Sequence, residues 1–246
     1  MFVAELTIAI VFGLVFGSFI SCASYRLPIG MDILRARSFC PKCEKTLSFV
    51  DLFPFFSWWF AGGKCRHCQE KISIRYPLIE LATAFIFAVL YMKYGFSLQW
   101  GVLAFAAVWL LVMIIADFEH YIIPDTVHLV LLPLGFLYRY ATHDLSLDII
   151  WSFSLLAGLA LLLHYGYSAL RGRTMLGFGD VKFMAVAGIW LKLGYIPSFL
   201  LVAGVLGVVL GIIWKKIGKG EVFPFAPALA VSLFLCLIFP QLNLLH

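Results

Sequence analysis

The sequence predicts an all-α polytopic membrane protein with about eight transmembrane helices and a small cytoplasmic zinc-ribbon-like loop domain. Three observations support this fold class. The chain of 246 residues is 63% hydrophobic and only 13% charged, which is more apolar surface than a soluble domain can bury. Apolar runs near the length of a bilayer crossing recur along it. Two C-x-x-C motifs lie in its one long polar segment.

The first apolar run covers residues 4–24, and we expect a retained transmembrane helix there rather than a cleaved signal sequence. Seven further runs approach the roughly 20 residues that a bilayer requires. They cover residues 78–94, 100–116, 126–141, 148–169, 180–194, 196–214 and 225–242. The predicted domains are a first transmembrane helix (1–24), a cytoplasmic zinc-binding domain (25–77) and a membrane domain of about seven helices (78–246).

Lysine and arginine predict which side of the membrane each segment faces. Of 18 such residues, nine lie in residues 25–77, three in 171–182 and three in 215–219. With eight crossings these three segments share one side, which the positive-inside rule makes cytoplasmic. Lys93, Arg139 and Lys192 lie near outer helix ends, where they are expected to snorkel. The polar residues His143, Asp144 and Asp148 lie in an outer loop and are expected to be solvated.

The two C-x-x-C motifs, CPKC and CRHC, predict a zinc site. Each motif supplies two sulfurs in one tight turn, and 21 residues separate the two, which is close to zinc-ribbon spacing. Disulfides are the weaker alternative because the cytoplasm keeps thiols reduced. Four thiolates leave no position for a reactive water, so a structural role is expected. The expected ligands are Cys40, Cys43, Cys65 and Cys68.

Ionisable residues within membrane helices are costly, and each is a candidate for function. Asp117 ends one apolar run and Asp180 begins another, both on the expected cytoplasmic side. Two carboxyl groups brought close together share a proton, so one can activate water while the other protonates a leaving group. This is aspartic-protease chemistry. Gly177 and Gly179 beside Asp180 would allow a sharp turn and the close approach of a substrate strand.

Other interpretations of these residues remain open. Asp180 can be only a helix N-cap, and Asp125, after Pro124, is more typical of a cap than of a catalyst. A presenilin-like intramembrane protease would share G-x-G-D but would not explain the cysteines. A transporter would place its acids near the bilayer midplane. A zinc-ribbon membrane adaptor without catalysis would leave Asp117 and Asp180 without a role.

Motifs along nearly the whole chain resemble those of the type IV prepilin peptidase family. They are GSF (17–19), RLP (26–28), CPKC (40–43), GGK (62–64), CRHC (65–68), RYPLIEL (75–81), DFEHYIIPD (117–125), GFGD (177–180) and PFAP (224–227). The resemblance implies a bacterial inner-membrane aspartic endopeptidase that cuts the basic leader of prepilins or pseudopilins on the cytoplasmic side. It assigns catalysis to Asp117 and Asp180, within a peptidase domain at 78–246. Supporting roles are expected for Glu119, His120, Asp125, Gly177 and Gly179.

The resemblance also implies N-methylation of the newly exposed residue by S-adenosylmethionine. It maps the methyl-donor site onto Gly63 and Lys64 in the cytoplasmic loop. Ser21 stands where the family usually has Asn, which could affect methylation, and Ala226 stands where PFGP is common. A peptidase without methyltransferase activity is therefore the alternative. The expected partners are prepilins or pseudopilins and membrane lipid, with no nucleic acid.

Overall fold

The computed structural model of the chain describes residues 1–33, 37–166, 168–169, 176–218, 220 and 222–243. Within these residues the secondary structure is helical, with two isolated antiparallel bridges and no strand. The chain divides into two compact units, Met1–Val108 and Trp109–His246, and the boundary falls inside helix α4, Leu98–His120. Part of the expected membrane orientation rests on residues outside the described ranges. They are Arg35, Arg171, Arg173 and Lys219.

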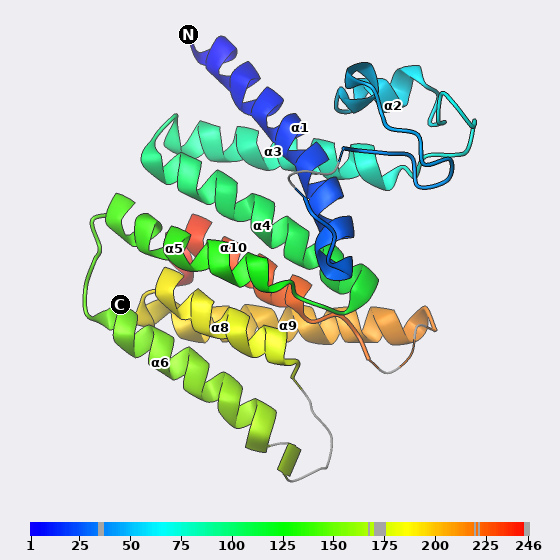
Figure 1. The fold of residues 1–246 in the computed structure, drawn as a ribbon. Helices are drawn as coiled ribbons and strands as arrows, with labels where there is room; N and C mark the ends of the chain where they lie inside the picture. Colours follow the sequence, from blue (N-terminus) through cyan, green and yellow to red (C-terminus); the bar gives the residue numbers. More distant parts are fainter. Residues whose placement is uncertain (34–36, 167, 170–175, 219, 221, 244–246) are drawn as a thin grey trace. The chain divides into compact units, whose positions relative to one another are not determined.

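The N-terminal unit is built on helices α1 (Phe2–Arg26) and α3 (Arg75–Tyr94), which lie against each other and are followed by the first half of α4 (Figure 1). The polar segment between α1 and α3 contains the short helix α2, Phe56–Phe60. Two 3-10 turns accompany it, at Leu27–Ile29 and Phe49–Leu52. This segment is therefore a compact loop with little regular structure, as expected for a domain held by a metal.

Two glycines bring α1 and α3 into backbone contact. A Cβ added to Gly13 would lie 2.4 Å from the Cα of Ala84, and one added to Gly17 would lie 2.4 Å from the Cα of Glu80. The spacing is the G-x-x-x-G pattern that lets membrane helices approach closely. The contact fixes Glu80, a buried carboxyl group, against the face of α1 that carries Gly17.

The C-terminal unit contains the end of α4 and five further helices. They are α5 (Asp125–Ala141), α6 (Asp148–Leu161), α8 (Phe178–Trp190), α9 (Ile196–Lys216) and α10 (Ala226–Ile238). Helix α8 packs against both α5 and α6 (Figure 1). Against α6 the contact is close, because a Cβ on Gly188 of α8 would lie 2.7 Å from the carbonyl oxygen of Ser152. Toward α5, Nε1 of Trp190 donates a hydrogen bond to the carbonyl of Leu131, at 2.9 Å.

The helices found in the described residues coincide with the apolar runs expected from the sequence. Five helical segments are long and apolar enough to cross a membrane, and they are Phe2–Ile29, Arg75–Tyr94, Leu98–His120, Asp148–Gly166 and Leu193–Lys216. Helices α5, α8 and α10 are shorter, at 17, 13 and 13 residues. The protein is thus an all-helical, multi-pass membrane protein with five candidate membrane helices, and eight crossings stay a prediction.

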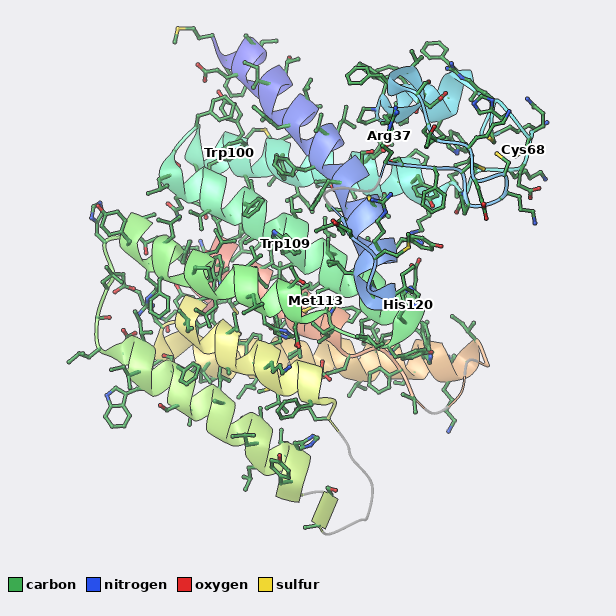
Figure 2. All side chains as sticks on the ribbon, viewed as in Figure 1. Arg37, Cys68, Trp100, Trp109, Met113 and His120 are labelled. Carbon is green, nitrogen blue, oxygen red and sulfur yellow. The ribbon has the colours of Figure 1, made fainter. Side chains whose placement is uncertain are left out.

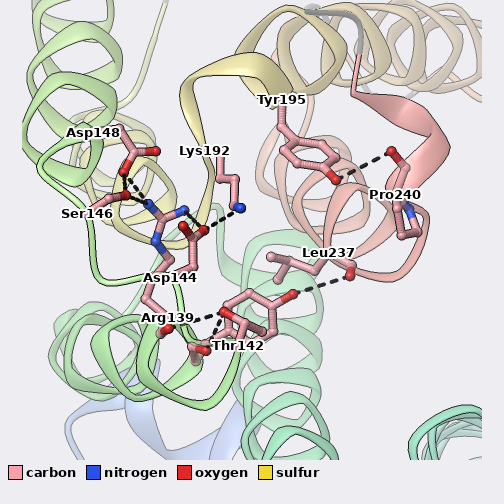
Figure 3. Close-up of polar contacts among 10 residues, drawn as sticks. Arg139, Thr142, Asp144, Ser146, Asp148, Lys192, Tyr195, Leu237 and Pro240 are labelled. Atoms are coloured by element: carbon pink, nitrogen blue, oxygen red, sulfur yellow. Dashed lines mark hydrogen bonds and ion pairs between the residues drawn. The ribbon is translucent and has the colours of Figure 1, made fainter. Parts of the chain in front are cut away.

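A cluster of charged side chains joins the C-terminal end of α5 to the start of α6 and the end of α8 (Figure 3). Arg139 is only 1% exposed and donates to Asp148 at 2.6 Å, and its guanidinium lies 3.2 Å from Asp144. Lys192 Nζ lies 2.7 Å from the same Asp144 carboxylate. The expectation that Arg139 would snorkel and that these acids would be solvated was wrong, because the acids fold back and neutralise the buried guanidinium.

Candidate active site and metal centre

Asp117 lies in the last turn of α4 and is buried, with 7% of its surface exposed. Its Oδ2 accepts a hydrogen bond from the backbone N–H of Ala226 at 2.9 Å. Ala226 is the first residue of α10, where backbone N–H groups have no partner within the helix. The carboxyl group is therefore oriented by a helix N-terminus 109 residues further along the chain. Figure 2 shows His120 at the end of the same helix, beyond Trp109 and Met113.

Asp180 lies in the first turn of α8, whose N-cap is Gly177. The side chain is half-buried, and it is close enough to Asp117 for the charge of one carboxyl group to act on the other. A Cβ on Gly177 would lie 3.1 Å from Oδ2 of Asp180, and a Cβ on Gly179 would lie 3.1 Å from Cβ of Ile123. Both glycines therefore leave room for groups that surround the acid.

The other ionisable residues that the sequence singled out near the two aspartates are more exposed than Asp117. Glu119 is exposed and His120 is half-buried. Asp125 is the first residue of α5, after the N-cap Pro124; it forms an ion pair with Lys182 at 2.6 Å and lies 3.8 Å from Nδ1 of His128. Its side chain is 70% exposed, so this pair contributes little to stability. The structure thus places Asp117 and Asp180 in partly or fully buried positions at helix ends and leaves Asp125 paired at the surface.

His128 is a residue that the sequence analysis missed. It lies in α5, is 7% exposed, and its Nε2 is 3.1 Å from the carbonyl oxygen of Gly179. A carbonyl oxygen can only accept, so Nε2 carries the proton, and Nδ1 is buried without a hydrogen-bond partner. The imidazole therefore holds the backbone directly before Asp180. The signal was a histidine three residues after Asp125 on an otherwise apolar stretch.

The four predicted metal ligands converge in the loop of the N-terminal unit. The Sγ atoms of Cys40, Cys43, Cys65 and Cys68 all lie within 4.8 Å of one another. The sulfurs of Cys40 and Cys68 are 3.9 Å apart, close to the separation of about 3.8 Å that four Zn–S bonds of 2.3 Å impose. Figure 2 places Cys68 on this loop, after α2. The cluster fits zinc in number, ligand type and spacing.

The two cysteine turns have the same backbone design. In each, the N–H of the first cysteine bonds to the carbonyl five residues later, Cys40 to Lys45 and Cys65 to Glu70. An antiparallel bridge flanks each turn, and a residue with positive φ follows its second cysteine, Glu44 at 56° and Gln69 at 60°. In the second turn, backbone N–H groups point at the sulfurs, from His67 and Cys68 to Cys65 and from Glu70 to Cys68.

The electrostatics of the second turn suit metal binding. Hydrogen bonds from the backbone N–H groups of Cys68 and His67 lower the pKa of Cys65 to about 7. A thiolate is the form that binds a metal, so Cys65 is prepared at neutral pH, whereas burial and hydrogen bonds with the neighbouring sulfurs raise the pKa of Cys68 to about 11. The chemistry that a bound ion would supply is cross-linking of the loop, because all four ligand positions are protein thiolates.

Gly63 and Lys64 precede the second cysteine turn. Gly63 is buried with φ at 67°, and an added Cβ would lie 2.9 Å from the Trp58 ring. Its N–H donates to the carbonyl of Trp58, and its carbonyl accepts from Ile72. Lys64 is exposed. Gly63 therefore shapes the turn that supports the Trp58 indole, while the Lys64 side chain is accessible.

The chain matches two family descriptions. Residues 11–94 match the Bacterial Peptidase A24 N-terminal domain, and residues 104–212 match the Type IV leader peptidase family. No solved structure matches the chain significantly.

Curated relatives match over nearly the full chain. A prepilin leader peptidase/N-methyltransferase of Pectobacterium carotovorum subsp. carotovorum is 31% identical, over 90% of this chain and 88% of its own length. A protein of the same description from Neisseria gonorrhoeae is 32% identical, with 92% and 87% covered. Another, from Bacillus subtilis (strain 168), is 31% identical, with 95% and 94% covered.

Proposed function

Since this chain belongs to the type IV prepilin leader peptidase family and is a protease of the membrane, we propose that Asp117 and Asp180 form its catalytic pair. The observation that supports the proposal is the setting of the two acids: Asp117 is buried in the last turn of α4 and bonded to the start of α10, and Asp180, 63 positions later, lies half-buried in the first turn of α8. The proposed reaction is hydrolysis of one peptide bond in a type IV prepilin or pseudopilin, after its basic leader.

The proposed mechanism uses one proton shared by the two carboxyl groups. One carboxylate removes a proton from the attacking water, and the protonated partner donates to the amide nitrogen that leaves. Because Oδ2 of Asp117 is held by the N–H of Ala226, its second oxygen is the one available to the water. Asp180 is more exposed than Asp117, so we assign it the position nearer to the arriving substrate.

The surroundings of the pair support this assignment. A backbone N–H bonds to Asp117, so replacing the family's common glycine by Ala226 preserves that contact. We propose that the acids face the cytoplasm in the bacterial inner membrane and that the eight apolar helices cross it, with the basic segments on the same side. A prepilin would present its apolar helix to the bundle and its leader to this face.

We propose that methylation of the new N-terminal residue by S-adenosylmethionine is the second activity. The support is the name shared by the relatives, prepilin leader peptidase/N-methyltransferase, together with the Gly63 turn and the accessible Lys64 in the N-terminal unit. The zinc cluster would hold this loop in shape. The acids of the peptidase lie in the other unit, so the two activities are expected to be separable by mutation.

The test of the peptidase is cleavage of a purified prepilin by wild-type protein and variants in detergent, followed by mass spectrometry of the product. Asp117→Asn and Asp180→Asn should each abolish cleavage, because an amide cannot exchange the proton. The matched control is Asp125→Asn, which removes an exposed carboxylate paired with Lys182 and should stay near wild type. Substantial turnover by Asp117→Asn or Asp180→Asn would remove that residue from catalysis.

A further inference from the structure

The N-terminal unit contains a partly open cavity of about 400 Å³ between α1, α3 and the cysteine loop. This volume lies in the range of pockets that hold small molecules and cofactors. Its walls combine aromatic rings, hydroxyls and charges in a way that a simple packing defect would not. The lining residues that matter here are Ser18, Tyr25, Trp58, Lys64, Tyr76 and Glu80.

Glu80 is the unusual group in this wall. Glu80 is only 7% exposed, and the backbone of α1 at Gly17 packs against it. Oε2 accepts the N–H of Phe55 at 2.7 Å, and Ser18 lies beside the carboxyl group. Among the residues that the structure describes, Glu80 has no ion pair with a lysine or arginine. A carboxylate buried without a cationic partner is costly, so a positively charged ligand in this cavity would stabilise the ionised form of Glu80.

The hydrogen bond to Phe55 does not by itself explain a charged residue. Phe55 has φ at 61°, and the bond from its N–H fixes the turn that leads into α2. A neutral glutamine at position 80 would accept the same bond through its amide oxygen. The hydrogen bond to Phe55 therefore does not require an acid at this position.

We propose that this cavity binds the methyl donor of the proposed methylation, and that the Glu80 carboxylate contacts the positive sulfonium of an adenosyl donor. The inference rests on the proposed second activity and specifies its site. Tyr25, Trp58 and Tyr76 provide aromatic surface for the purine and for the cation. Lys64, on the same wall, provides a positive charge for the donor's carboxylate.

The charge also distinguishes donor from product. In methyl transfer, the lone pair of the neutral N-terminal amine attacks the methyl carbon, and the carbon–sulfur bond breaks with its electron pair left on sulfur. The positive charge moves to nitrogen, which then loses a proton to water. The product thioether is neutral at sulfur, so Glu80 holds it less tightly than the donor, and the product leaves.

The test is titration calorimetry of the full-length, zinc-containing protein in detergent with S-adenosylmethionine and, separately, S-adenosylhomocysteine. Wild type should prefer the sulfonium ligand by about tenfold, the value of one contact with a charged group. Glu80→Gln should bind the two ligands within about twofold of each other, because the amide has no charge to distinguish them. Glu70→Gln, an exposed acid on the same cavity wall, is the matched control and should keep the wild-type preference.

The outcomes separate this inference from the proposed peptidase. Glu80→Gln should retain its zinc and cleave prepilin at the wild-type rate, since the Phe55 bond survives and the acids lie in the other unit. Retained preference for the sulfonium in Glu80→Gln would overturn the assignment of Glu80. A wild-type protein that cleaves prepilin and binds neither ligand would overturn the donor site and leave the peptidase intact.

A second measurement does not depend on the folding of a variant. Ultraviolet cross-linking of wild type to labelled S-adenosylmethionine, followed by peptide mapping, should place the label on α1, α3 or the segment around Trp58. Unlabelled donor in excess should remove the label. Specific labelling confined to residues 109–246 would overturn the proposal.

Discussion

His128→Leu tests whether the backbone before Asp180 must be held in place for catalysis. The leucine removes the only side-chain donor that the described residues direct at the Gly179 carbonyl, and it leaves the apolar packing of α5 largely filled. The bond is 3.1 Å long and lies at a residue that is 7% exposed, so no solvent water replaces it easily. The lost hydrogen bond is the one that holds the carbonyl group of Gly179, the residue immediately before Asp180.

The expected size follows from the burial of this contact. Leaving a buried acceptor without its partner costs about 1–3 kcal/mol. If the whole cost falls on the position of Asp180 in the reacting complex, kcat drops by about 5- to 150-fold, at 1.36 kcal/mol for each factor of ten. His128 is not proposed to contact the substrate, so KM should change little.

The assay is initial-rate cleavage of a purified prepilin over a range of concentrations, which separates kcat from KM. His128→Gln places an amide N–H near the position of Nε2 and should recover most of kcat. His128→Asn reaches only the position of Nδ1 and should resemble the leucine variant. A His128→Leu enzyme with wild-type kcat, or equal losses in the glutamine and leucine variants, would refute the reasoning.

Two further predictions concern the N-terminal unit. Purified protein should contain about one zinc per chain by elemental mass spectrometry, and Cys40→Ser or Cys65→Ser should lose the zinc. The control Cys22→Ser, in α1 and outside the cluster, should keep it. Wild-type protein that contains no zinc after careful preparation would contradict the metal centre. Gly17→Ala should lower the free energy of unfolding by about 1–3 kcal/mol, because its Cβ would lie 2.4 Å from the Cα of Glu80. The control is Gly101→Ala in α4, where an added Cβ meets open space, and it should be neutral or stabilising in the same denaturant titration. If Gly17→Ala were as stable as wild type, the α1–α3 contact would be looser than described.

The parts that sequence could predict are those with a local signal. The apolar runs mark helices within a few residues of their ends because lipid-facing segments are almost uniformly apolar. The metal cluster follows from two short turns, and each turn is determined by residues within seven positions, such as Phe39 to Thr46. That Asp117 and Asp180 end and begin helices was also visible in the pattern of apolar residues.

The parts that sequence could not predict depend on contacts between distant positions. Nothing near Asp117 indicates that Ala226 would donate to it, and nothing near Gly179 indicates His128 in another helix. The RYPLIEL motif does not reveal that Glu80 is buried, because its burial depends on the glycines of α1 and on the turn at Phe55. Helix lengths were also less certain, since an apolar run does not reveal that α8 ends after 13 residues.

The charged cluster around Arg139 determines where the C-terminal unit can deform. It ties the ends of α5, α6 and α8 that are remote from Asp180, because Arg139 closes α5, Asp148 opens α6 and Lys192 follows α8. Helix α8 spans about 20 Å from this anchor to its first turn, at 1.5 Å per residue. Tilting it by about 5° around the anchored end would shift the acid-bearing end by about 2 Å while the ion pairs stayed intact. At the acid-bearing end, α8 is held by the His128–Gly179 hydrogen bond and the Asp125–Lys182 ion pair, so a movement of Asp180 away from α5 must lengthen these contacts.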